Sequence, residues 1–506
     1  MLRFFGPPGT GKTTTLLNLV DEALGAGVDP NKIGYFAYTR KASEVARERA
    51  VERFNKDPKK DFLYFRTLHS LSFRLLGLST EDVLQEAQLK ELSEKIGIDL
   101  MTGGDSSREE GFVGFRSNHP IMRLIDFTRT TLQDPKTCYN RSDIAEPRNV
   151  FLHVFSEYER YKKENKILDF TDMLVDISTK PQRFPFFNCC FVDEAQDLTP
   201  LQWKLVEILD SHSERMYLAG DDDQGIYRWA GAALKHFVNL PSSSEVLEQS
   251  YRIPRKIWQV ADTVSKRISF RQEKFWAPRP DDGEVHRIYD TYGLTFPQEE
   301  EWLILSQAHY QLSPLAEELK SSGAYFERFG RTSLGERVRK AISAWNNLTE
   351  DAGNKISLSE AQNLYNHISS GKQGIGRGAK KLLKTFPENS KFSLGILQKD
   401  LGLNAKGLWS EALDRISNED RVYASQLLAN GVRLDETPKI RLSTIHGAKG
   451  GEADNVLLFL DLSAKALQDM EKTPDDAWRV LYVAVTRARN RLVLKASEDL
   501  QRGWQI

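Results

Sequence analysis

The sequence has few cysteines, almost no net charge and no long apolar run. Its three cysteines (Cys138, Cys189 and Cys190) are too few for the disulfide framework of a small secreted protein. Two of them lie in an apolar segment, where buried and reduced thiols are expected. No apolar stretch approaches the roughly 20 residues that a membrane-spanning helix needs. The chain opens on residues typical of a strand rather than of a signal peptide. We therefore expect a cytoplasmic protein without membrane contact.

The net charge of −1 gives no global attraction to a polyanion, so any nucleic-acid surface has to be local. At 506 residues the chain is too long for one hydrophobic core, and several domains are expected. No group of His, Cys and Asp residues has the spacing of a zinc or iron–sulfur site, so neither is predicted.

What the sequence does contain is a complete phosphate-binding loop, GPPGTGKT, directly after a short apolar run. In such a loop the backbone N–H groups surround phosphate oxygens, Lys12 reaches the β- and γ-phosphates, and the Thr13 hydroxyl ligates Mg²⁺. The residues predicted to bind ATP here are Gly6, Pro7, Pro8, Gly9, Thr10, Gly11, Lys12, Thr13 and Thr14. A glycine-rich loop alone is often only a turn, but the lysine and threonine favour a nucleotide site.

An apolar segment that ends in Asp193 and Glu194 supplies the second half of this site. NTPases hold their metal and polarise the attacking water with carboxylates in such a position. The two segments together predict an enzyme that hydrolyses a nucleoside triphosphate. We expect Mg²⁺ to bind Thr13 and Asp193, and Glu194 to act as the general base.

Apolar runs that end in polar or glycine-bearing loops occur near both ends of the chain, which is typical of parallel α/β sheets. These runs are Lys32–Tyr38, Cys189–Val192, Met216–Ala219, Ile440–Thr444, Val456–Leu460 and Arg491–Leu494. Between them, residues 79–166 and 336–434 have helical patterns, the first with apolar side chains at helical spacing from Phe151 to Tyr161. Residues 103–107 are predicted to form an exposed loop. The pattern indicates two α/β lobes with inserted helical domains.

Nine segments then make the prediction specific. In chain order they are Gly6–Thr13 (GPPGTGKT), Tyr38–Ala42 (YTRKA), Thr67–Ser70 (TLHS), Leu168–Met173 (LDFTDM), Asp193–Asp197 (DEAQD), Gly220–Trp229 (GDDDQGIYRW), Gln249–Arg252 (QSYR), Ser443–Gly450 (STIHGAKG) and Tyr482–Ala488 (YVAVTRA). This order resembles that of the UvrD/Rep family of superfamily 1 DNA helicases, over the whole chain. The resemblance implies an α/β fold of two RecA-like P-loop motor lobes with parallel sheets, each with a mainly helical inserted domain. It places the first lobe at residues 1–80 and 165–244 with insertion 81–164, and the second at 245–335 and 436–506 with insertion 336–435.

The resemblance also implies roles around ATP, which would lie between the lobes. Gln224 is similar to the family glutamine that senses the γ-phosphate. Arg252 and Arg487 resemble the two arginines that neutralise charge in the transition state, a role that suits a planar and permanently charged side chain. Tyr251 is expected to stack on adenine, and Glu452 to contact the ribose. A surface ion pair is the alternative for either arginine.

Further positions match residues that contact single-stranded DNA in the family. They are Tyr38, Thr39, His69, Tyr227, Trp229 and His446. Aromatic side chains stack on bases of any sequence, which suits a motor that must not be sequence-specific. For Tyr227 and Trp229 the alternative is core packing, and the two histidines could equally be core residues that hold loops.

A basic stretch, GKQGIGRGAKKLLK at 371–384, contains no acidic residue. Its Gly374, Ile375 and Gly376 resemble the turn by which the second insertion of the family grips duplex DNA. With Lys380 and its neighbours, such a turn would bind phosphates without sequence preference. The alternative is a solvated helix face.

The chain departs from the family in three ways. The glutamine segment that reads the adenine edge upstream of the phosphate loop is missing, so base selectivity is open. Ala230 stands where the family often has arginine, and the segment between the motifs of Arg252 and Thr444 is short, which favours a reduced second insertion.

The resulting hypothesis is an ATP-dependent DNA helicase that moves 3′ to 5′ on single-stranded DNA and engages single-strand/duplex junctions, with Mg²⁺ and ATP as cofactors. A protein partner of a replication or repair complex is a further expectation. Two alternatives are a translocase that displaces bound proteins with little unwinding, and a nucleic-acid-stimulated ATPase switch that does not translocate. An RNA helicase is disfavoured by the motifs.

Overall fold

The computed structural model describes residues 1–37, 40–54, 57, 60–101, 105–109 and 112–506. The chain divides into two compact units. The first comprises Met1–Arg255, Asp262–Asp281 and Thr473–Tyr482, and the second comprises Lys256–Ala261, Asp282–Lys472 and Val483–Ile506. Within the described ranges, no helix combines the length and the apolar character needed to cross a bilayer. The four-part domain boundaries given above stay a prediction.

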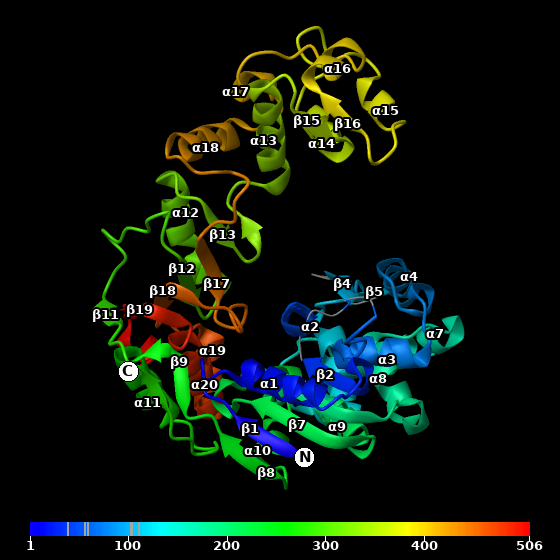
Figure 1. Cartoon of the computed structure of the whole chain (residues 1–506), viewed down its shortest axis with the longest axis vertical. Coiled ribbons are helices and arrows are strands. Elements are labelled where there is room, and N and C mark those ends of the chain that lie inside the picture. The colour runs from blue at the N-terminus through cyan, green and yellow to red at the C-terminus, as the bar shows by residue number, and fades with distance from the viewer. Residues whose placement is uncertain (38–39, 55–56, 58–59, 102–104, 110–111) are drawn as a thin grey trace. The chain divides into compact units, whose positions relative to one another are not determined.

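The first unit is built on a six-stranded sheet in which every pairing is parallel (Figure 1). In spatial order its strands are β3 (Phe65–Arg66), β2 (Ile33–Ala37), β6 (Phe187–Asp193), β7 (Ser213–Gly220), β1 (Leu2–Phe5) and β8 (Ser243–Val246). The strands β1, β6 and β7 are neighbours, so the loops that follow them lie at one edge of the sheet. This edge holds both the phosphate loop and Asp193.

Alternation along the strands creates one hydrophobic core on each face of this sheet. Phe4, Tyr35 and Phe191 pack with helices α1 and α2, whereas the adjacent Phe5, Phe36 and Val192 pack with α3, α8, α9 and α10. Both faces are covered, which explains why the strands are almost uniformly apolar. The helices of this unit are α1 (Lys12–Gly25), α2 (Arg40–Phe54), α3 (Leu68–Leu76), α4 (Glu86–Ile96), α5 (Pro120–Thr130), α6 (Pro135–Asn140), α7 (Arg148–Asn165), α8 (Phe170–Ser178), α9 (Pro200–Ser211) and α10 (Leu234–Asn239).

A separate core lies among α4, α5, α6 and α7, as expected for an inserted helical domain. A buried ion cluster ties this insertion to α8. The Nζ atom of Lys162 (α7) donates to Asp169 and to Asp172, both at 2.7 Å. Arg129 (α5) binds the same two carboxylates, 2.5 Å from Asp169. Burial alone would raise the pKa of Asp169, but Lys162 and Arg129 together lower it.

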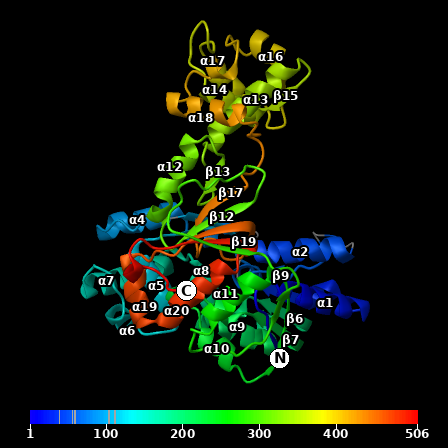
Figure 2. The same cartoon turned by 90° about the vertical axis from the view of Figure 1, so that its left-hand side faces the viewer.

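The second unit contains a seven-stranded sheet, parallel except for its last pair. In spatial order the strands are β11 (Glu284–Ile288), β19 (Ala488–Lys495), β18 (Ala453–Phe459), β12 (Trp302–Ser306), β17 (Ile440–Thr444), β13 (Phe326–Arg328) and β14 (Arg331–Thr332). Figure 2 shows α12 (Ser313–Ser321) beside β12, β13 and β17, where its apolar side chains join the core of the sheet. Helix α19 (Ala464–Lys472) belongs to this unit, while α11 (Arg255–Ser265) and α20 (Pro474–Val485) have residues in both.

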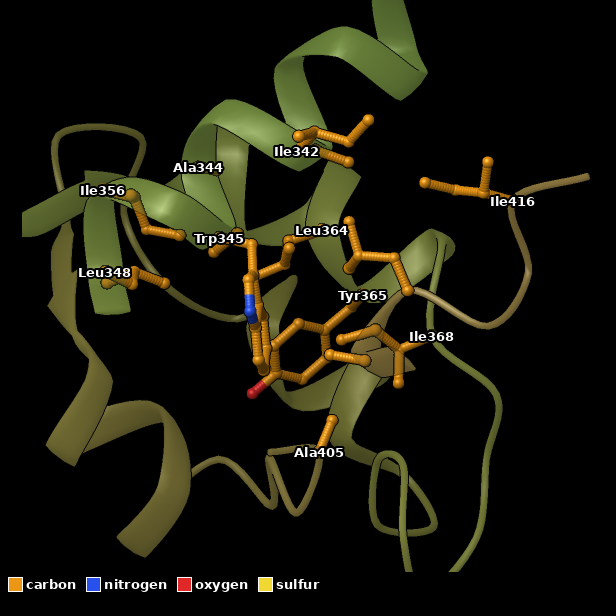
Figure 3. Packing of buried hydrophobic residues seen from close by; sticks show 14 of the residues in the cluster. Ile342, Ala344, Trp345, Leu348, Ile356, Leu364, Tyr365, Ile368, Ala405 and Ile416 are labelled. Atoms are coloured by element: carbon orange, nitrogen blue, oxygen red, sulfur yellow. The ribbon is translucent and has the colours of Figure 1, made fainter. Parts of the chain in front are cut away.

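The insertion of the second unit has its own core, centred on Trp345 and Tyr365 (Figure 3). Its elements are α13 (Glu336–Glu350), β15 (Lys355–Ser357), α14 (Leu358–Asn366), α15 (Ala379–Leu383), β16 (Lys391–Ser393), α16 (Leu394–Lys399), α17 (Trp409–Ala412) and α18 (Asn418–Ala429). In both views these elements gather at one end of this unit. Most of these elements are helices, and the predicted insertion at residues 336–435 stays a prediction.

The predicted strands all exist: Ile440–Thr444 has the predicted bounds, and the other strands end one to three residues from the predicted positions. The loop predicted at 103–107 is wrong in its described part, because Asp105–Glu109 forms β4, which pairs with β5 (Phe112–Arg116). Two further short strands, β9 (Gln249–Pro254) and β10 (Ala277–Arg279), pair in parallel in the first unit. The three cysteines are free, and Cys189 and Cys190 are buried as expected; Cys138 is buried as well.

Candidate nucleotide site and nucleic-acid surfaces

The phosphate loop turns sharply between β1 and α1. Gly9 and Gly11 have φ values of 73° and 82°, in the left-handed region that favours glycine. The loop is closed by the Thr10 hydroxyl, which donates to the Pro7 carbonyl at 2.8 Å. The ammonium group of Lys12 lies within the loop, 2.9 Å from the Gly6 carbonyl oxygen. This is the arrangement expected of a phosphate cradle.

A hydroxyl and a carboxylate meet at the start of α1. The Thr13 hydroxyl donates to Oδ2 of Asp193 at 2.8 Å, and the buried Tyr35 hydroxyl donates to the same oxygen at 2.9 Å. Burial and the neighbouring Glu194 carboxylate raise the pKa of Asp193. A buried carboxylate beside a hydroxyl fits a hard divalent cation, which prefers oxygen ligands and offsets this unfavourable burial.

Glu194 follows Asp193 in a constrained conformation, with a φ of 55° that is uncommon outside glycine. Its carboxylate accepts from the Gln196 amide at 2.5 Å. The carbonyl of the same amide accepts from the Asp221 backbone N–H at 3.0 Å, and Gln224 donates to the Asp221 carboxylate at 2.7 Å. Since Gln196 is fully buried, it forms a fixed link between Glu194 and the loop that carries Gln224.

The QSYR segment packs directly on the phosphate loop. The Ser250 hydroxyl donates to the Pro8 carbonyl at 2.7 Å, and the Tyr251 N–H donates to the Gly9 carbonyl at 2.8 Å. A Cβ atom on Gly9 would lie 2.3 Å from the Cβ of Arg252, so only glycine fits there. These contacts bring Tyr251 and Arg252 to the phosphate loop, and the Tyr251 side chain is 75% exposed.

Buried charges hold the GDDDQ loop in place. Lys274 lies 3.3 Å from Asp221 and 2.9 Å from Asp223, and it also contacts Asp222. Arg271 grips Asp223 with two hydrogen bonds of 2.8 and 2.5 Å. The three carboxylates are fully buried, so this pairing offsets their loss of hydration. The loop that carries Gln224 is therefore rigidly supported.

Two predicted ATP residues lie in the second unit. The guanidinium of Arg487 is buried and donates to the carbonyls of Val483 at 2.9 Å and Gly451 at 3.2 Å. The Glu452 carboxylate accepts from Arg489 at 3.4 Å. Both side chains are therefore oriented by neighbours within their own unit.

Comparison with known proteins identifies the family. Residues 5–245 match the family model of the UvrD/REP helicase N-terminal domain, and residues 439–494 match that of the UvrD-like helicase C-terminal domain. The chain belongs to the UvrD/Rep helicase family. It is an ATP-dependent DNA helicase of the UvrD type.

Similar proteins include helicases of two bacteria. A probable DNA helicase II homolog of Mycoplasma genitalium is 23% identical, over 96% of this chain and 81% of its own length. The ATP-dependent DNA helicase PcrA of Bacillus subtilis is 24% identical, over 94% of this chain and 68% of its own length.

The predicted DNA-contacting residues of the helicase lie in different surroundings. Trp229 is 62% exposed, which excludes core packing for this side chain, and Tyr227 lies edge-on to it with ring centroids 6.4 Å apart.

His69 packs edge-on against Phe170. Burial and the nearby Lys449 lower the pKa of the half-buried His446. Tyr38 and Thr39 lie outside the described residues.

In the second insertion of the helicase, Ile375 is fully buried in the core. Gly374 and Gly376 make backbone hydrogen bonds to residues 402–405. Lys380 is half-buried, and burial together with the Arg415 cation lowers its pKa. A duplex contact by this turn would therefore involve its backbone and its exposed basic side chains rather than Ile375.

Sequence reasoning missed several residues that support the site. Gln196 lies inside the DEAQD motif, which was the available signal for it. Ser250 likewise lies inside QSYR. Tyr35 and Lys274 carry no such signal, because an aromatic residue in a strand and a single lysine are ordinary features of any sequence. Their partners become visible only once the chain is folded.

Proposed function

We propose that this helicase translocates 3′ to 5′ along single-stranded DNA, unwinds duplex DNA at single-strand/duplex junctions, and is driven by ATP hydrolysis at the phosphate loop. The observation that carries the proposal is the convergence of Lys12, Thr13 and Asp193 with Glu194 at one sheet edge. The relatives named PcrA and DNA helicase II support the same activity.

In the proposed mechanism Thr13 and Asp193 would hold Mg²⁺, which would supply positive charge beside the phosphates. Lys12 and the backbone N–H groups of residues 9 and 11–14 bind the phosphate oxygens. Glu194 accepts the proton of the attacking water, and its position is fixed by the hydrogen bond from Gln196. Each of these groups acts on charge that develops during phosphoryl transfer.

The remaining residues are proposed to link hydrolysis to movement. Gln224 senses the γ-phosphate, and a change there reaches Glu194 through Asp221 and Gln196.

Arg252 and Arg487 stabilise the transition state. Tyr251 stacks on adenine, and Glu452 contacts the ribose. Trp229, exposed on the same loop as Gln224, stacks on a base of the bound strand. Coupling between nucleotide and DNA thus runs along residues 220–229.

The test is strand separation of matched duplexes with either a 3′ or a 5′ single-stranded tail. Unwinding of the 3′-tailed substrate alone is the expected result. Unwinding from the 5′ tail would overturn the polarity. The same tailed duplexes with a protein bound ahead of the enzyme test the alternative, a translocase that displaces bound proteins with little unwinding. Displacement of that protein without strand separation would overturn the proposal that this helicase unwinds duplex DNA.

A further inference from the structure

The carboxylate of Asp193 is held by hydrogen bonds on both of its oxygens. Oδ2 accepts from the Thr13 hydroxyl at 2.8 Å and from the Tyr35 hydroxyl at 2.9 Å. Oδ1 accepts from the backbone N–H of Glu194 at 2.9 Å. A carboxylate offers about four lone-pair positions, so these three bonds between described residues leave room for a cation. Of the three donors, Tyr35 is the one that belongs to none of the nine motifs.

The ring of Tyr35 is fixed in its orientation by the strands on either side of it. The side chain is completely buried. In the sheet Tyr35 lies directly opposite Phe65 of β3 and Phe191 of β6. Its ring stacks on both, with ring centroids 5.2 Å from Phe65 and 6.2 Å from Phe191. Because close packing on both sides prevents the ring from turning, its hydroxyl is directed at one place.

The length of a tyrosine side chain is needed to reach the Asp193 carboxylate. Ala37, and not Tyr35, lies opposite Asp193 in the paired strands. Tyr35 precedes Ala37 by two residues, which is about 6.6 Å along a strand. A serine or threonine at position 35 would be too short, whereas phenylalanine would fill the same space without a donor. The packing of this residue and its hydrogen bond can therefore be separated by one substitution.

The hydroxyl suits a position near a cation because it is a neutral donor. A lysine or arginine in its place would also hold the carboxylate, but its charge would repel a divalent cation nearby. A ligand that is already oriented before the ion arrives loses less freedom on binding. Groups that orient metal ligands in this way typically change metal affinity by about 10- to 100-fold.

We propose that Tyr35 is a positioning residue for the divalent cation. Its hydroxyl holds the Asp193 carboxylate in the orientation in which Asp193 and Thr13 together bind Mg²⁺. In this role Tyr35 acts through the carboxylate and not on the cation itself. The inference rests on the proposed function, in which Mg²⁺ binds at Thr13 and Asp193. It follows that the Mg²⁺ concentration needed for ATP turnover, rather than the maximal rate, depends on this hydroxyl.

The first experiment measures binding of a fluorescent, non-hydrolysable ATP analogue to the full-length protein, in EDTA and over a series of Mg²⁺ concentrations. Tyr35→Phe should bind the analogue as the native protein does in EDTA. It should need about 10-fold more Mg²⁺ for the half-maximal increase in affinity. Because no hydrolysis takes place, this measurement reports on the cation site and not on catalysis.

Tyr217→Phe is the matched control. Tyr217 in β7 stacks on Phe191 from the next strand, with ring centroids 5.1 Å apart, and its hydroxyl lies beside Arg215. The same Mg²⁺ midpoint for Tyr35→Phe and Tyr217→Phe would overturn the proposal. Equal weakening by Tyr35→Phe with and without Mg²⁺ would overturn it as well, because the hydroxyl would then support the phosphate loop and not the cation.

The second experiment measures ATP turnover by the same proteins against Mg²⁺ concentration. Tyr35→Phe should raise the Mg²⁺ concentration for half-maximal turnover, with a maximal rate within about twofold of the native one. A lower maximal rate at an unchanged Mg²⁺ requirement would contradict a positioning role. If turnover by the native protein needs no divalent cation, the metal role in the proposed function is overturned, and the inference with it.

Discussion

At the scale of single residues, Glu194 is the side chain on which hydrolysis depends most. Glu194→Gln keeps the size of the side chain and its contact with Gln196 but removes the basic oxygen. We expect ATP turnover to fall by about 100- to 10,000-fold while ATP binding is retained. Steady-state turnover and nucleotide binding measure the two effects separately. Glu214→Gln, in β7 away from the site, is the control, and near-normal turnover by Glu194→Gln would show that another base acts.

Gln196 is the second residue whose role can be isolated. Gln196→Met preserves volume but removes the bonds to Glu194 and Asp221. Loss of buried hydrogen bonds worth about 1–3 kcal/mol should lower turnover about 10- to 100-fold. The stimulation of ATP turnover by DNA should fall more than the affinity for ATP. Gln202→Met removes a buried bond to the Thr199 amide at 2.9 Å without touching Glu194, so equal effects of both variants would contradict a linking role.

The sequence predicts most of this site because its motifs are local. GPPGTGKT and the carboxylates at the end of β6 each identify their own chemistry, and the parallel strand order brings the two segments together. The contact between Ser250 and the phosphate loop could not be predicted, because it joins segments that are far apart in the chain. The same holds for Lys274, because only folding brings this lysine to the three consecutive carboxylates of Asp221, Asp222 and Asp223.

At the scale of elements, the buried ion cluster holds the first insertion on the motor fold. Lys162→Met removes one of the two cations that neutralise Asp169 and Asp172. Breaking a buried pair by loss of one partner costs about 3–5 kcal/mol. We expect the first thermal unfolding transition to shift down by several degrees.

Lys163→Met is the matched control for this effect, because Lys163 is the exposed neighbour on the same helix. Equal transition temperatures for the two variants would mean that the cluster contributes little to stability. Limited proteolysis between α5 and α8 locates the weakened region. Protection equal to that of the native protein there would contradict the proposed attachment.

Element types were predictable where periodicity is long. The helical spacing from Phe151 to Tyr161 matches α7, and the apolar runs match the central strands. Short elements could not be predicted in the same way. The strands β4, β15 and β16 have at most five residues, and so few residues contain too little alternation of apolar and polar side chains to distinguish a strand from a loop.

At the scale of the whole molecule, the order of the motifs along the chain is the strongest signal of function. It identifies a helicase family whose domain models match both ends of this chain. Neither the composition nor the net charge indicates that the chain binds DNA, because the chain is nearly neutral. The basic stretch at residues 371–384 is a local feature of the sequence, in agreement with a local rather than a global attraction to DNA.

The central claim is that ATP hydrolysis drives movement along single-stranded DNA. The most direct test measures ATP turnover by the full-length protein without DNA and with single strands of increasing length. The account predicts low turnover without DNA, and a rise with strand length to a plateau, because a longer strand allows more steps before the end is reached. Turnover that is indifferent to DNA, or stimulated equally by strands of every length, would contradict translocation.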